Sequence, residues 1–93
     1  MKIFSLVLPC YNESENIDNL LDLITKLKKN ENNLEIIVVE NGSTDNSLVK
    51  IKNHKAYKNN IITLVEIKKN LGYGHGIMSG LYKGTGKYIG WCH

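Results

Sequence analysis

The sequence contains no arginine, and its positive charge comes from twelve lysines spread along the chain, which leave a net charge of +3. Proteins that bind nucleic acid usually concentrate their cations on one face and place aromatic residues among them. Scattered lysines are instead typical of a solvated surface. We therefore expect no nucleic-acid partner.

The sequence also lacks a long apolar run, since none approaches the ~20 residues that a membrane-spanning helix needs. The Met-Lys start is not followed by the apolar core of a signal peptide. We therefore expect a cytoplasmic protein whose present segment makes no membrane contact. Without an export signal, the two cysteines, Cys10 and Cys92, are expected to be free thiols.

The length of 93 residues, with 42% hydrophobic and 23% charged residues, fits one small globular domain at most. Internal repeats and low-complexity tracts are absent from the sequence. The chain stops directly after an apolar segment, with no closing helix or polar tail. We interpret it as a fragment of a larger domain.

Apolar segments alternate with segments of helical spacing along the chain. The predicted strands cover residues 3–8, 35–39, 61–67 and 87–91. A helix is predicted between each strand and the next, which gives the order βαβαβαβ. Short connections in this order imply right-handed crossovers, and hence an α/β Rossmann-like parallel sheet of strand order 3-2-1-4 with helices on both faces.

The second strand is the clearest signal, because Ile36 to Val39 are all β-branched and apolar, as in a strand covered on both faces. The first strand is expected to stop at Pro9, which has no N–H for the ladder. Asn12 and Glu15 fit a capping-box start of the first helix. Its apolar face is predicted to consist of Ile17, Leu20, Leu21, Ile24 and Leu27.

Polar residues follow the second strand at the edge where open α/β sheets bind ligands. Glu40 and Asn41 stand there, and they are our first candidate site residues. Gly42 allows a tight turn, and Ser43, Thr44 or Asp45 can cap the helix that follows. The alternative is that Glu40 and Asn41 are simply turn residues that cap this helix.

Three motifs then agree with one family in letters and in spacing. They are Val-Leu-Pro-Cys-Tyr-Asn-Glu at residues 7–13, Ile-Val-Val-Glu-Asn-Gly-Ser-Thr-Asp at residues 37–45, and Asn-Leu-Gly at residues 70–72, with Gly80 and residues 86–89 after them. This set resembles the nucleotide-binding half of the family 2 glycosyltransferases. The resemblance implies a GT-A fold that binds a nucleotide-sugar through Mg²⁺ or Mn²⁺ and transfers the sugar with inversion. Residues 1–93 would be the N-terminal, nucleotide-sugar-binding half of that domain.

The same resemblance implies a set of nucleotide-binding residues. Pro9, Tyr11 and Glu13 would lie against the nucleoside, and Asn41 would occupy the position of an aspartate that hydrogen-bonds the base. The full candidate set for the nucleotide is Pro9, Tyr11, Glu13, Glu40, Asn41, Gly42, Asn70 and Gly72. For Tyr11, stacking on the base and plain hydrophobic cover of the sheet edge remain equally open.

Two departures from the family pattern matter. Glu40-Asn41 replaces the usual pair of aspartates, and because an amide both donates and accepts hydrogen bonds, the base preference cannot be inherited. His93 stands at the position of the first aspartate of the metal-binding Asp-x-Asp motif, and the second carboxylate is missing. A single imidazole suits neither Mg²⁺ nor Mn²⁺. We therefore expect no transferase activity from this chain alone.

Several alternatives remain open. The chain could be a non-catalytic small α/β module that binds nucleotides or a partner, or a dinucleotide-binding fragment, as Gly72, Gly74 and Gly76 faintly suggest. Close packing of helix on sheet explains these glycines better. A zinc site is a less favoured possibility, formed by Cys10, His75, Cys92 and His93. Apolar surface along the fourth strand predicts self-association.

Overall fold

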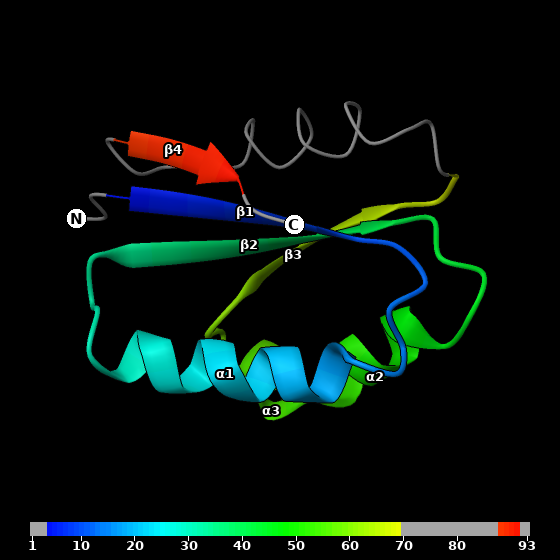
Figure 1. The fold of residues 1–93 in the computed structure, drawn as a ribbon, viewed down its shortest axis with the longest axis horizontal. Coiled ribbons are helices and arrows are strands. Elements are labelled where there is room, and N and C mark those ends of the chain that lie inside the picture. The colour runs from blue at the N-terminus through cyan, green and yellow to red at the C-terminus, as the bar shows by residue number, and fades with distance from the viewer. Residues whose placement is uncertain (1–3, 70–87, 92–93) are drawn as a thin grey trace.

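The computed structural model describes residues 4–69 and 88–91 (Figure 1). Within these ranges the elements are β1 (Phe4–Cys10), α1 (Ile17–Lys29), β2 (Leu34–Asn41), α2 (Ser47–Asn53), α3 (Lys55–Lys58), β3 (Thr63–Ile67) and β4 (Tyr88–Trp91). The strands form one sheet in the order β3-β2-β1-β4, and each neighbouring pair is parallel. The predicted α/β parallel fold is confirmed, and the order of the described strands agrees with the predicted 3-2-1-4, whereas the predicted helices on the second face are not tested by the described residues.

β2 is the centre of the sheet, as its β-branched composition predicts. Its last six residues are buried, and successive side chains point to opposite faces. Ile36 and Val38 belong to the apolar cluster on the helix side, whereas Ile37 and Val39 join Val7 in a cluster on the other face. Both faces of this strand are therefore covered.

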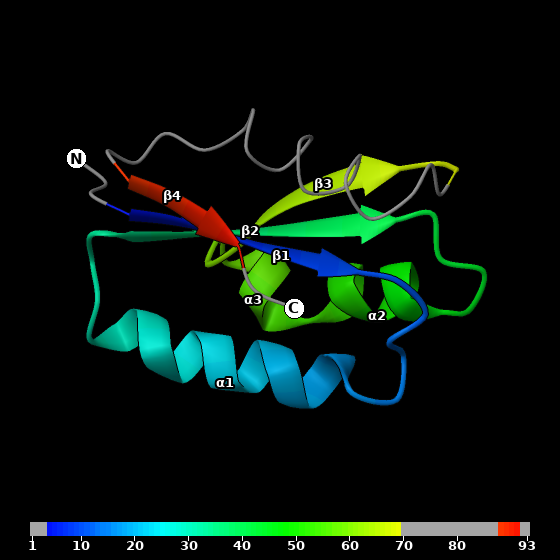
Figure 2. The ribbon, with the colours of Figure 1, turned by 45° about the horizontal axis from the view of Figure 1, so that its top comes forward.

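The described helices all lie on one face of the sheet (Figures 1 and 2). α1 turns Ile17, Leu21 and Ile24 into the core, while Leu27 at the end of the predicted face is 47% exposed. The helix predicted to carry Ile77, Met78, Leu81 and Tyr82 lies outside the described residues. Among the described helices, none has the length and apolar character needed to cross a membrane.

Two predicted strand ends are wrong. β1 continues through Pro9 to Cys10, because its parallel pairing with β2 runs on through Pro9 with Val39 to Cys10 with Glu40. β2 runs on to Asn41, because Glu40 and Asn41 are in register with Glu66 and Ile67 of β3.

The capping box predicted at Asn12 and Glu15 is also wrong. α1 begins at Ile17, its N-cap is Asn16, and no side chain caps it. Asn12 has a left-handed backbone (φ 52°), which does not belong to a helix start of this kind. Its side chain is used elsewhere, as described below.

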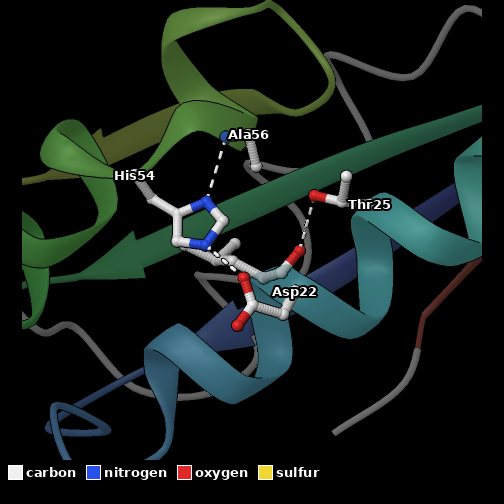
Figure 3. Close-up of polar contacts among 5 residues, drawn as sticks. Asp22, Thr25, His54 and Ala56 are labelled. Atoms are coloured by element: carbon white, nitrogen blue, oxygen red, sulfur yellow. Dashed lines mark hydrogen bonds and ion pairs between the residues drawn. The ribbon is translucent and has the colours of Figure 1, made fainter.

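The segment predicted to be irregular, residues 53–60, contains α3 and the ring of His54. The Nδ1 atom accepts the N–H of Ala56 at 3.0 Å, and Nε2 lies 2.8 Å from Oδ1 of Asp22 on α1 (Figure 3). Because Nδ1 acts as an acceptor, the ring proton belongs on Nε2, which then donates to Asp22. The ring thus caps α3 and ties it to α1.

The packing of α1 predicts the effect of one core substitution. Leu21 is fully buried and Leu23 is 64% exposed on the same helix. Leu21→Ala is expected to lower the free energy of unfolding by about 2–5 kcal/mol, because it removes buried methyl groups and leaves a cavity. Leu23→Ala, the matched control, should change it by less than about 0.5 kcal/mol. Urea unfolding followed by circular dichroism measures both, and equal losses would contradict the packing.

Candidate functional site

The carboxyl ends of β1 and β2 bring two loops together at one edge of the sheet. The strands are parallel, and their last described pair is Cys10 with Glu40. The first loop (residues 11–16) and the second loop (residues 42–46) therefore leave neighbouring strands at the same edge, before α1 and α2 (Figures 1 and 2). This is the edge at which the sequence predicts a ligand site.

Asn12 joins the tips of the two loops. Its Oδ1 atom accepts the backbone N–H of Thr44 at 2.8 Å and that of Asp45 at 3.3 Å, and the Thr44 hydroxyl lies 3.4 Å away. The backbone N–H of Asn12 donates to the hydroxyl of Ser43 at 2.9 Å. The sequence predicts Asn12 as part of a helix cap, whereas in the structure Asn12 joins the two loops.

A second group of bonds ties the first loop to the start of α2. The N–H of Glu13 donates to the Ser47 hydroxyl at 3.0 Å, and that of Ser14 to the Asp45 carboxylate at 3.3 Å. The Lys50 ammonium donates to the Ser14 carbonyl at 2.6 Å. Asp45, one of the three predicted caps, accepts the Ser47 N–H at 2.9 Å, but the N-cap of α2 is Asn46, whose side chain makes no capping bond.

Glu40 and Gly42 shape the second loop. Both carboxylate oxygens of Glu40 accept the N–H of Ser43, at 3.1 and 3.3 Å, although the residue is only 3% exposed. Gly42 has φ 70°, which favours glycine and lets the chain turn directly after the strand. Glu40 is therefore part of the buried end of β2, and the prediction that it lies in the loop is wrong.

The structure gathers most of the predicted nucleotide-binding residues at this edge but gives them different exposure. Tyr11 is 44% exposed and Glu13 is also exposed, whereas Asn41 is 4% exposed and Pro9 is half-buried. Three further candidates lie outside the described residues: Asn70, Gly72 and His93. Tyr11 is the first residue after β1, and Asn41 is the last residue of β2, one position after the Cys10–Glu40 pair.

The loop pairing that sequence reasoning missed had a partial signal. Ser43, Thr44 and Asp45 form a polar cluster directly after the strand. Asn12 lies two residues after Cys10, and Ser43 lies three residues after Glu40, the register partner of Cys10. A predicted parallel order therefore indicates that these loops meet, but it does not say which side chain accepts from which N–H.

Cys10 is a buried free thiol beside three carboxylates. Burial first, and then the negative charges of Glu40, Glu13 and Asp45, raise its pKa to about 12. The thiolate is the form that binds metals and attacks electrophiles, so this cysteine is poorly suited to either task. The partners suggested for it in a zinc site, His75, Cys92 and His93, lie outside the described residues.

The described residues do not supply a site for a divalent cation. Among residues 4–69 and 88–91, no group of three or more His, Cys, Asp or Glu side chains could hold a metal ion. His93, the predicted metal position, is outside these ranges.

Asp45 has a pKa of about 2 instead of 3.8, chiefly because the Ser47 hydroxyl donates to its carboxylate. A lowered folded-state pKa gives stability that is present above pH 3.8 and is lost as the pH falls through about 2. Because Asp45 is exposed, water screens this contribution. The Asp45–Ser47 contact thus makes stability at this edge depend on acidity.

This dependence can be tested with Ser47→Ala. The Asp45 pKa is expected to rise toward 3.8, and the acid-induced loss of stability attributable to Asp45 should shrink. Titration of the side-chain carboxyl carbon by NMR measures the pKa directly. Ser43→Ala is the matched control, because the Ser43 hydroxyl accepts from Asn12 and is not a cause of the shift. An unchanged Asp45 midpoint in Ser47→Ala would contradict the assignment.

Comparison with known proteins identifies related enzymes. The chain is 31% identical over 86 residues to an undecaprenyl-phosphate 4-deoxy-4-formamido-L-arabinose transferase of Proteus mirabilis, and the alignment covers 91% of this chain and 26% of that protein. The chain is also 32% identical over 85 residues to a poly-beta-1,6-N-acetyl-D-glucosamine synthase of Staphylococcus aureus, and this alignment covers 91% of this chain and 20% of that protein. The chain thus spans between a fifth and about a quarter of the length of these relatives.

Solved structures share the fold. TarS of S. aureus, residues 1–349 in complex with UDP, superposes with a TM-score of 0.79 at 26% identity, covering 99% of this chain and 27% of that one. The mannosyltransferase PcManGT of Pyrobaculum calidifontis, in complex with GDP-Man and Mn²⁺, gives a TM-score of 0.76 at 27% identity, covering 92% and 25%.

The family assignment covers nearly the whole chain. The sequence profile of glycosyl transferase family 2 matches residues 5–93. This range contains β1 apart from Phe4, all of β2, and the first and second loops that follow them. The resemblance seen in the three sequence motifs is thereby confirmed, and the chain belongs to glycosyl transferase family 2.

Proposed function

We propose that this chain is the part of an inverting, cation-dependent glycosyltransferase that binds the nucleoside of a nucleotide-sugar donor. The observation that carries the proposal is the joined pair of loops at the ends of β1 and β2, with exposed Tyr11 directly after β1 and buried Asn41 at the end of β2. Open α/β sheets bind ligands at this edge. The related structures in complex with UDP and with GDP-Man and Mn²⁺ support the same class of ligand.

Tyr11 and Asn41 offer the two kinds of contact that a base requires. An exposed aromatic ring can stack on any base, and such a contact contributes about 1–3 kcal/mol. The Asn41 amide can donate to one atom of a base edge and accept from another. Because the family's aspartate only accepts, the base preferred by this protein is decided by an amide rather than a carboxylate.

The cation belongs to the complete enzyme in this proposal. Mg²⁺ or Mn²⁺ supplies positive charge to the diphosphate as it leaves the sugar. The described residues offer no ligand group for it, so its ligands would come from other residues. What the described residues do is hold and orient the nucleoside. The predicted self-association stays a prediction.

A ligand titration separates this function from the alternatives. UDP, GDP, CDP and NAD are added to the ¹⁵N-labelled chain with and without Mn²⁺, and the amide signals of Tyr11, Asn41 and Gly42 are followed. A nucleoside diphosphate is expected to shift these signals, and NAD is not. Shifts caused equally by NAD would favour a dinucleotide-binding fragment, and silence toward all four would favour a non-catalytic interaction module.

Two exposed tyrosines among the residues whose exposure the structure describes provide a matched pair of variants. Tyr11→Ala is expected to weaken binding of the nucleoside diphosphate by roughly tenfold or more, because a stacking contact is lost. Tyr57 is 36% exposed on α3, in the helix layer, so Tyr57→Ala should leave the dissociation constant unchanged. Isothermal titration calorimetry measures both. Equal dissociation constants for wild type and Tyr11→Ala would remove Tyr11 from the site.

A further inference from the structure

We propose that Asn12 is a positioning residue: it joins the first and second loops in the arrangement in which Tyr11 and Asn41 bind the nucleoside. This inference rests on the function proposed above and adds to it a residue that does not itself contact the ligand. Its basis is the set of cross-loop bonds of one side chain and the backbone conformation that makes them possible.

The side chain of Asn12 reaches two successive backbone amides of the other loop. Its Oδ1 atom accepts from Thr44 at 2.8 Å and from Asp45 at 3.3 Å, which span 32 and 33 positions in the sequence. A backbone turn that lacks strand or helix partners leaves such N–H groups to be satisfied by side chains. Asn12, a residue of the first loop, thus satisfies two backbone N–H groups of the second loop.

The backbone of Asn12 is adapted to this task. Its φ of 52° lies in the left-handed region, which asparagine enters more readily than other residues with a side chain. The turn directs its own N–H to the Ser43 hydroxyl at 2.9 Å while its side chain accepts from the next two residues. Donor and acceptor of one residue therefore hold three consecutive residues of the second loop.

The other cross-loop bonds cannot replace these. Glu13 and Ser14 donate to Ser47 and Asp45, at and just before the start of α2. Asn12 directly follows Tyr11, and its partners begin one residue after Gly42. Among these cross-loop bonds, those of Asn12 are therefore the nearest in sequence to Tyr11 and Asn41. If the Asn12 side chain is removed, its bonds to the N–H groups of Thr44 and Asp45 are lost, and only the bond from its own N–H to the Ser43 hydroxyl is left.

Three variants separate the side chain from the backbone conformation. Asn12→Gly keeps the left-handed turn accessible but removes the acceptor. Asn12→Asp keeps an acceptor oxygen in the same place. Asn60→Gly is the matched control, because Asn60 is the other described asparagine with positive φ (59°) and lies in the exposed turn before β3. Thermal unfolding confirms that each variant folds.

Two readouts are taken on the full 93-residue chain: hydrogen exchange of the Thr44 and Asp45 amides without ligand, and affinity for UDP, GDP and CDP. In Asn12→Gly, we expect both amides to exchange about tenfold faster and the nucleotide that binds wild type to bind about tenfold more weakly. Asn12→Asp is expected to restore amide protection, and Asn60→Gly should change neither readout.

Each outcome decides a different claim. Unchanged exchange of Thr44 and Asp45 in Asn12→Gly, or faster exchange with unchanged nucleotide affinity, would overturn the positioning role. Failure of Asn12→Asp to restore protection would overturn it as well. If wild type binds none of the three nucleotides, the proposed function fails, and the positioning role fails with it, whereas the exchange data alone still show whether Asn12 joins the loops.

Discussion

The parallel pairing of β1 with β2 is the constraint on which the site depends. Seven consecutive pairs, from Phe4 with Leu34 to Cys10 with Glu40, fix how far each strand extends before its loop begins. In this register Ile36 and Val38 face the helix layer, and Ile37 and Val39 belong to the cluster on the other face of the sheet. The register also places the loops that follow Cys10 and Glu40 at the same edge of the sheet.

The edge combines a rigid apolar support with polar loops that satisfy one another. Glu40 is buried at the strand end and accepts from Ser43, while Asn12 accepts from the next two residues of the same loop. Binding residues are often carried by loops on a rigid sheet, because the sheet fixes where each loop starts. Here the two loops are also joined to each other by the bonds of Asn12.

Local reasoning succeeded where burial follows a regular period and failed where a distant partner intervened. The run Ile36 to Val39 predicted a strand covered on both faces, and the 3.6-residue spacing predicted the buried face of α1. The capping box at Asn12 was wrong because the side chain bonds to the second loop, 32 positions away. α3 was missed because His54 caps it while held by Asp22 of α1.

The sequence by itself determined the α/β class, the strand order and the family, because these follow from periodicity, connection length and motif spacing, and it predicts the edge at which a ligand would bind. Only the tertiary structure decided that Glu40 and Asn41 are buried strand residues and that Asn12 joins two loops. The physical reason is that β-ladder pairing and side-chain bonds to backbone N–H groups depend on which atoms meet in space, and no local pattern specifies those partners.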